Sequence, residues 1–225
     1  MTFTVIVSTV RSYRLTTHSL LTGYSCTLDT TFNLAKDAEV HCKINMTQKL
    51  YGGIGPRKTP LTVLPLMTEI ASQLAGAQWL LRSGHGKGAD QAFGVGAPVE
   101  LKEIFLPEAG FNDAPHYACY KVGITTERVA RIARMHHDKY DTMRPAYQRL
   151  MDRNVNIILG EHADSPVDFV VYWQSEEGAA DYFGGTNHSL RIAKTFAIPT
   201  FNIRLDDELE ALVAFVNEKD SVPWT

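Results

Sequence analysis

Apolar positions along residues 46–225 follow two alternating periods, and these periods predict strands that alternate with helices. Short apolar runs predict β-strands at residues 49–51, 79–82, 103–106, 155–159, 167–173 and 199–203. Helical spacing is seen at Val63, Leu66, Met67, Ile70, Ala71 and Leu74, and again at Leu209, Leu212, Val213 and Val216. Mostly apolar strands between helices indicate a parallel sheet that is covered on both faces. The sequence therefore predicts an α/β fold, a three-layer Rossmann-like parallel sheet with helices on both faces.

Helix boundaries follow from capping residues and prolines. Thr62 is expected to cap the first helix, and another helix is expected to begin at about Ala89. The segment 126–152 predicts two helices, of which the first is capped by Thr126 and the second starts at Pro145.

Residues 1–45 differ from the rest of the chain. Nine threonines fall within the first 31 positions, and no helical or strand period is sustained there. We expect an irregular N-terminal extension over 1–45 and a Rossmann-like domain over 46–225.

Composition and charge exclude several classes of protein. The apolar fraction of 44% is too high for a disordered chain, and no apolar run approaches the roughly 20 residues of a membrane span. The start of the chain does not have the pattern of a signal peptide, and the three cysteines form no C-x-x-C pair. These features predict a cytoplasmic protein. A net charge of −3 argues against a surface that binds nucleic acid throughout, but it allows a local basic patch.

Glycine-rich turns recur at 52–57, 83–90 and 184–187, each predicted to lie between a strand and a helix. Glycine allows the backbone to approach a ligand closely, and the N-terminus of the following helix offers unpaired N–H groups to an anion. In a parallel sheet all such turns lie at the carboxyl edge, where they can form one crevice. The candidate ligand-binding residues in these turns are Gly52, Gly53, Gly55, Arg57, Ser83, Gly84, Lys87, Gly88, Asp90, Gly184, Gly185 and Thr186.

The expected ligand is anionic and carries a phosphate, with Arg57 and Lys87 as counter-charges. Neither G-x-G-x-x-G nor G-x-x-x-x-G-K-[ST] is present with its proper spacing, which disfavours classical dinucleotide binding and P-loop hydrolysis. Two interpretations of Asp90 stay open: it binds a ribose hydroxyl, or it is a carboxylate that interacts favourably with the dipole of its helix.

Histidine positions do not predict a metal site. His136 and His137 would point about 100° apart on a helix, a poor arrangement for one ion, so we expect a solvent-facing pair. No cofactor is predicted.

Three segments together resemble DNA-processing protein A, the DprA/Smf family, and in particular its short stand-alone members in phages and prophages. They are Tyr51–Lys58, Leu81–Asp90 and Gly184–Thr186, followed by Ala193 and Ile198-Pro199, and the resemblance covers residues 49–203. It implies a place in the SLOG superfamily, whose Rossmann-like domains bind nucleotides and nucleotide-derived ligands and are usually dimers. The superfamily also includes the Lonely-guy phosphoribohydrolases, whose arginine-containing motif looks like Met151-Asp152-Arg153-Asn154 here.

The resemblance implies ligand binding by Arg153 and Asn154, whereas the residues alone also allow a surface salt bridge for Arg153. It further implies two alternatives to nucleotide binding. Single-stranded DNA binding by a DprA-like homodimer is disfavoured by the net charge of −4 over residues 46–225. Phosphoribohydrolase activity is the least favoured, because Ser189 stands where those enzymes carry a glutamate.

Overall fold

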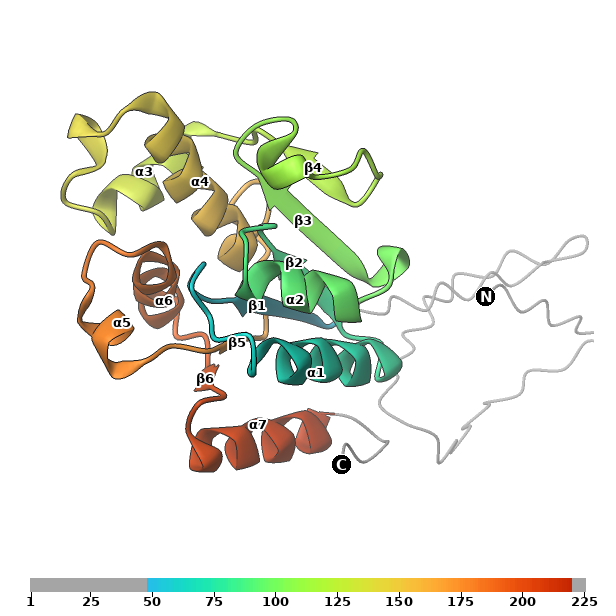
Figure 1. The fold of residues 1–225 in the computed structure, drawn as a ribbon. Helices are drawn as coiled ribbons and strands as arrows, with labels where there is room; N and C mark the ends of the chain where they lie inside the picture. Colours follow the sequence, from blue (N-terminus) through green and yellow to red (C-terminus); the bar gives the residue numbers. More distant parts are fainter. Residues whose placement is uncertain (1–47, 220–225) are drawn as a thin grey trace, which may run out of the picture. The chain divides into compact units, whose positions relative to one another are not determined.

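The computed structural model describes residues 48–219, and within them six parallel strands form one sheet (Figure 1). The strand order is β4-β3-β2-β1-β5-β6. The strands are β1 (Leu50–Ile54), β2 (Leu80–Ser83), β3 (Lys102–Leu106), β4 (Tyr120–Val122), β5 (Phe169–Tyr172) and β6 (Thr200–Asn202). All five strand pairs are parallel, which confirms the predicted Rossmann-like α/β sheet.

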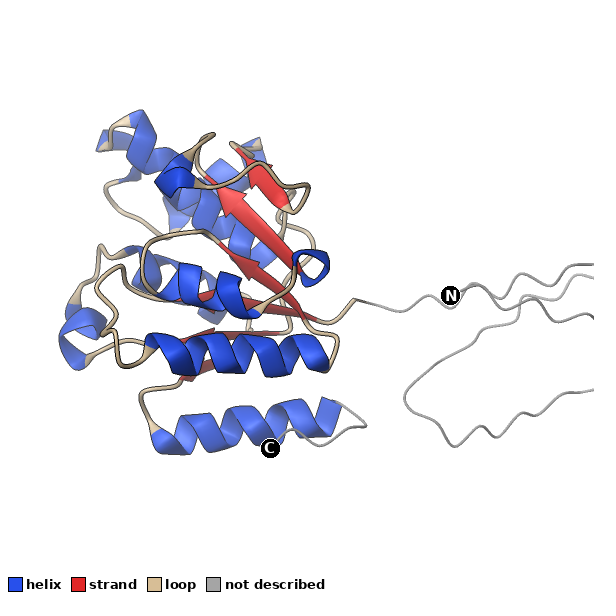
Figure 2. Cartoon of the chain, turned by 45° about the vertical axis from the view of Figure 1, so that its right-hand side comes forward, coloured by secondary structure: helices blue, strands red, loops and turns tan. Residues whose placement is uncertain are grey.

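Helices cover both faces of the sheet, as Figures 1 and 2 show. They are α1 (Leu64–Gly76), α2 (Ala89–Gly96), α3 (Glu127–Met135), α4 (Pro145–Leu159), α5 (Glu176–Ala180), α6 (Gly185–Thr195) and α7 (Asp206–Lys219). One apolar core lies between the sheet and α1, α2 and α7, and a second lies between the sheet and α3, α4 and α6. The three predicted layers are therefore present.

Side chains of the central strands alternate between the two cores, as the period of a β-strand requires. On β5, Phe169 and Val171 enter the first core and Val170 enters the second. The Phe169 ring stacks on Tyr51 of β1 at 5.8 Å and meets Trp79 edge-on at 4.9 Å. These aromatic contacts fill the first core at the middle of the sheet.

The predicted strand at Val155–Leu159 is wrong, because this run forms the last turns of α4. All five residues are buried, so an apolar run that was expected to be a buried strand belongs instead to a helix covered on most sides. Gly160, with φ of +80°, ends the helix. Arg153 accordingly lies within α4 and does not come just before a strand.

Other boundaries are confirmed or shifted. Helix α2 begins at Ala89 and α4 at Pro145, as predicted, and the Thr126 hydroxyl accepts a hydrogen bond from Val129 N at the start of α3. The predicted cap at Thr62 is wrong, because Val63 occupies that position and makes no side-chain cap. Strand β4, at the edge of the sheet, is short and was not predicted from the sequence.

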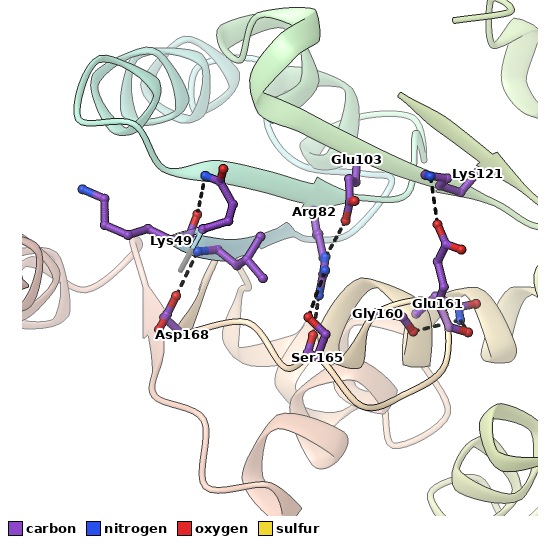
Figure 3. A network of polar contacts seen from close by, with 11 residues as sticks. Lys49, Arg82, Glu103, Lys121, Gly160, Glu161, Ser165 and Asp168 are labelled. Carbon is purple, nitrogen blue, oxygen red and sulfur yellow. Dashed lines mark hydrogen bonds and ion pairs between the residues drawn. The ribbon is translucent and has the colours of Figure 1, made fainter. Parts of the chain in front are cut away.

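Polar side chains tie the connection between α4 and β5 to the sheet (Figure 3). Arg82 of β2 donates from Nε to Glu103 Oε2 at 2.8 Å and from Nη1 to the Ser165 carbonyl. At the beginning of the two central strands, Leu50 N donates to Asp168 Oδ2 at 2.8 Å. The first two bonds tie β2 to β3 and to the connection before β5, and the third holds the start of β5 beside β1.

Within residues 48–219, no helix is both long and apolar enough to cross a membrane. The predicted irregular extension at residues 1–45 lies outside the described residues and stays a prediction.

Candidate functional site

The loops that follow β1 and β2 lie side by side at the carboxyl edge of the sheet, because the two strands are parallel neighbours. The chain leaves β1 toward β2 on one side, whereas β5 pairs with β1 on the other side. The order of the strands therefore reverses at β1, and ligands of open α/β sheets commonly bind at such a reversal.

The two loops are in direct contact. A Cβ added to Gly88 would lie 2.8 Å from the carbonyl oxygen of Arg57 and 3.0 Å from that of Pro56. Gly88 also has φ of +83°, a conformation that side chains other than glycine rarely adopt. Glycine at this position thus brings the first loop against the start of α2.

A buried carboxylate joins the two loops from below. Asp90, in the first turn of α2, accepts a hydrogen bond from Gly86 N at 3.1 Å, and the nearby backbone N–H of Gly55 favours its ionised form. Arg153 of α4 donates from Nη1 to Asp90 Oδ2 at 3.1 Å. The side chains of Arg153 and Asp90 are 10% and 7% exposed, so Arg153 forms a buried ion pair and not the surface salt bridge considered from the sequence.

Burial acts on both members of this pair. It raises the pKa of Asp90, against the opposing effects of the Arg153 guanidinium and the amides of Gly86 and Gly55. Burial also lowers the pKa of Arg153, and the nearby charge of Arg57 lowers it further, against the opposing effect of Asp90. Arg57 is thus close enough to Arg153 for their charges to interact.

The Arg153 guanidinium packs directly against Gly84. A Cβ at Gly84 would lie 1.6 Å from Arg153 Nη1, which excludes any side chain there while Arg153 keeps its place. The Nε atom of Arg153 is buried and has no hydrogen-bond partner among the described residues. The guanidinium carbon lies 5.9 Å from the centre of the Phe111 ring.

Three exposed cationic side chains belong to the loops that follow β1 and β2. Arg57 and Lys58 are exposed in the loop after β1, and Lys87 is exposed in the loop after β2. None of the three forms an ion pair with another residue of 48–219. The two loops that carry them meet at Gly88, directly before α2, whose first N–H groups have no partner within the helix. The arrangement favours an anion, by charge and by hydrogen bonding.

Two of the predicted glycines lie in β1 itself. Gly52 and Gly53 are buried in the strand, so the turn begins only at Gly55. A Cβ at Gly53 would lie 2.7 Å from the Phe93 ring of α2, which shows that glycine here makes room for helix packing. Ser83 is also buried, and its hydroxyl donates to the Gly53 carbonyl at 2.7 Å. Contact of these three residues with a ligand stays a prediction.

The third predicted turn, at Gly184–Thr186, opens α6 as expected, although α5 intervenes between it and β5. Asn154 of α4 donates from Nδ2 to the Gly185 carbonyl at 3.3 Å. Since Arg153 contacts Gly84 and Asp90, adjacent residues of α4 reach the second and third turns. Residues 153 and 154 of α4 therefore contact the second and third of the three segments that carry the resemblance.

Two histidines close to the start of α6, His137 and His188, are buried. His137 is 1% exposed, so the expected solvent-facing pair with His136 is wrong. Its ring lies 5.8 Å from that of His188 and 5.5 Å from that of Phe183, which covers it. Burial lowers the pKa of His188 to about 3. The described residues contain no group of three or more His, Cys, Asp or Glu side chains that could hold a metal ion.

The sequence did not predict one group of residues at the carboxyl edge of the sheet. Tyr120, the first residue of β4, lies near His85 of the second loop, and Tyr117, in the connection that follows β3, lies near Tyr120. Neither period nor motif marks these tyrosines, and only the pairing of β3 with β2 and β4 places them at the site.

Comparison with known proteins adds a similarity of fold. No protein-family model matches the chain, and no curated protein matches it. Among solved structures, it is similar to DNA processing protein A from Helicobacter pylori, in a structure that describes a single-stranded DNA binding mode. The two share 15% identity with a TM-score of 0.47, over 69% of this chain and 65% of that chain. This chain thus spans less than two thirds of that structure.

Proposed function

We propose that this chain binds a phosphate-bearing nucleotide or nucleotide-derived ligand over the loops that follow β1 and β2. The observation that carries the proposal is a set of exposed cations, Arg57, Lys58 and Lys87, in the loops at the N-terminus of α2, none of which has an ion-pair partner within residues 48–219. A phosphate at this place would gain both Coulomb attraction and backbone hydrogen bonds.

The buried ion pair between Arg153 and Asp90 supports the same proposal. Arg153 is held under the loops by Asp90, and the absence of a side chain at Gly84 leaves space for its guanidinium. The pair carries no net charge, so it supports binding by holding the two loops in place, which reduces the entropic cost of ordering them on binding.

Binding of nucleotides to the whole chain tests the proposal. Inorganic phosphate, AMP, GMP, CMP and UMP would be titrated by calorimetry into the wild type and into the double variant Arg57→Ala/Lys87→Ala. We expect at least one nucleotide to bind the wild type and its Kd to rise by about tenfold or more in the variant, because each lost charge-assisted contact weakens binding.

The control carries the same change of charge elsewhere. Arg128 and Arg131 are exposed on α3, and the variant Arg128→Ala/Arg131→Ala should keep the wild-type affinity. The proposal fails if none of the probes binds, or if both double variants lose affinity equally.

Single-stranded DNA binding is the second candidate, and the exposed Tyr117 supports it. Tyr117 is 54% exposed beside Tyr120, which contacts His85 in the same loop as Lys87. Single-stranded nucleic acid binds by stacking on aromatic rings within basic grooves. Titration of a labelled oligonucleotide at two salt concentrations would distinguish it from mononucleotide binding, since DNA affinity falls steeply with salt. A homodimer, as the resemblance implies, stays a prediction.

Phosphoribohydrolase activity receives less support. Ser189, at the position of the glutamate, is 2% exposed, and α6 contains neither Asp nor Glu. Release of free base from AMP, lost in Arg153→Ala, would be needed to establish it.

A further inference from the structure

A cavity of about 230 Å³ lies at the carboxyl ends of β3 and β4. Leu106 and Ala114 are its buried apolar residues, and Tyr117, Tyr120 and Val122 form much of its wall. Ligand sites for whole drug-sized molecules commonly enclose about 300–1,000 Å³. The cavity is therefore of the size for one ring system and not for an entire nucleotide.

Aromatic rings gather at this cavity. The rings of Tyr117 and Tyr120 are 6.0 Å apart, and His85 meets Tyr120 edge-on with ring centres 5.6 Å apart. Such surfaces bind flat aromatic groups, because stacking on a ring is favourable for every base. The hydroxyls of Tyr117 and Tyr120 add hydrogen-bonding groups to the apolar walls, and His85 lies against Tyr120 outside the lining residues.

His85 connects the cavity to the phosphate site. It belongs to the same loop as Lys87, and Asn112 Nδ2 donates to the His85 carbonyl at 3.0 Å. His85 itself has φ of +55°, a conformation that favours glycine, and the Asn112 bond holds it there. Since β2 and β3 are adjacent strands, only about 5 Å of sheet width separates their carboxyl ends.

We propose that this cavity binds the base of the nucleotide, with the sugar spanning the ends of β2 and β3 and the phosphate at Arg57 and Lys87. The assignment rests on the proposed function and adds to it that the ligand must carry a planar heteroaromatic base. Burial lowers the pKa of His85, which keeps its imidazole neutral and able both to donate and to accept a hydrogen bond at neutral pH.

The test compares ligands with and without a base. Calorimetry would give the affinity of the full chain for AMP, GMP, CMP, UMP and ribose 5-phosphate. We expect at least one nucleotide to bind about tenfold more tightly than ribose 5-phosphate, which lacks the base.

Two variants remove the base site in different ways. Tyr117→Ala deletes a stacking ring, and Ala109→Trp fills the cavity from an exposed position of its wall. Each should abolish the preference for the nucleotide while leaving the affinity for ribose 5-phosphate unchanged. Tyr147→Ala is the matched control, because Tyr147 is 52% exposed on α4 and is not part of the cavity.

The outcomes separate this inference from the proposed function. If ribose 5-phosphate binds as tightly as every nucleotide, or if the preference survives both variants, the base site is wrong and the phosphate site stands. If no phosphate-bearing probe binds, the proposed function fails. In that case the base site is also wrong, unless adenosine, guanosine, cytidine or uridine binds the wild type and Tyr117→Ala abolishes that binding.

Discussion

The Arg153 guanidinium lies 3.1 Å from the Asp90 carboxylate, and both side chains are almost fully buried. This ion pair joins α4, on one face of the sheet, to the start of α2 on the other face. It passes beneath the loops that follow β1 and β2, so it supports the backbone that would contact a phosphate. Arg153 and Asp90, both candidates from the sequence, are thus bound to each other.

Loss of Arg153 should destabilise the fold strongly. Arg153→Met leaves the Asp90 carboxylate buried without its counter-charge, which typically costs about 3–5 kcal/mol in the free energy of unfolding. Urea unfolding followed by circular dichroism would measure this cost. In the double variant with Asp90→Asn the cost should be much smaller, because the unpaired charge is gone.

Arg149 provides the control on the same helix. It pairs with Glu108 at 2.8 Å, but both side chains are largely exposed, at 39% and 55%. Arg149→Met should therefore change the free energy of unfolding by about 1 kcal/mol or less. Equal costs for the two arginines would contradict the buried pair.

A methyl group at Gly84 should displace Arg153. The added Cβ would overlap Nη1 of the guanidinium, and overpacking of this kind commonly costs about 1–3 kcal/mol. Gly84→Ala should also cost much less in an Arg153→Ala background, since the obstacle is then absent. Thermal or urea unfolding of the four proteins in this cycle gives the coupling directly.

Gly94 is the matched glycine. It lies in α2 with nothing within 4 Å of an added Cβ, so Gly94→Ala should stabilise the protein by about 0.5–1 kcal/mol. A destabilisation at Gly84 that persists without Arg153 would show that some other contact is responsible.

His188 should make stability depend on pH. The pKa of about 3 in the folded protein lies below the ordinary value of 6.5, because the ring is buried. The unfolded chain therefore binds more protons between these pH values, and the folded state loses stability as the pH falls. The slope approaches about 1.4 kcal/mol per pH unit in this window.

The variant His188→Gln removes this titration and retains an amide that can donate to the Ala133 carbonyl, the present partner of Nε2 at 3.2 Å. Between pH 6.5 and 5, the wild type should lose about 2 kcal/mol more than the variant. Stability curves that stay parallel over this range would rule out a buried neutral His188.

Tyr140 should stabilise α4 through a buried carboxylate. Its hydroxyl donates to Asp152 Oδ1 at 2.7 Å, and Thr125 donates to the other carboxylate oxygen at 3.0 Å. Burial raises the pKa of Asp152, and both donors oppose that shift. Tyr140→Phe should cost about 1–3 kcal/mol in urea unfolding, because one oxygen loses its partner. Tyr147→Phe, at an exposed tyrosine, should cost less than about 0.5 kcal/mol.

Most elements of the fold could be predicted because their signals are local. The helical stripe ending at Leu74 and the proline at the start of α4 depend on neighbours within a few turns, and both predictions hold. The run Val155–Leu159 could not be assigned in this way, since strands and helices that are buried on all sides have the same composition. Only its packing in the second core decides that it is helical.

The same distinction between local and long-range information applies to the candidate site. By itself the sequence determined that strands and helices alternate and that glycine-rich segments with Arg57 and Lys87 follow β1 and β2, because composition and spacing are local properties. The tertiary structure alone decided that Gly53 accommodates Phe93 and that Asp90 pairs with Arg153, 63 residues away. The physical reason is that burial and ion pairing depend on which segments meet in space, and a sheet brings together residues that are remote in the chain.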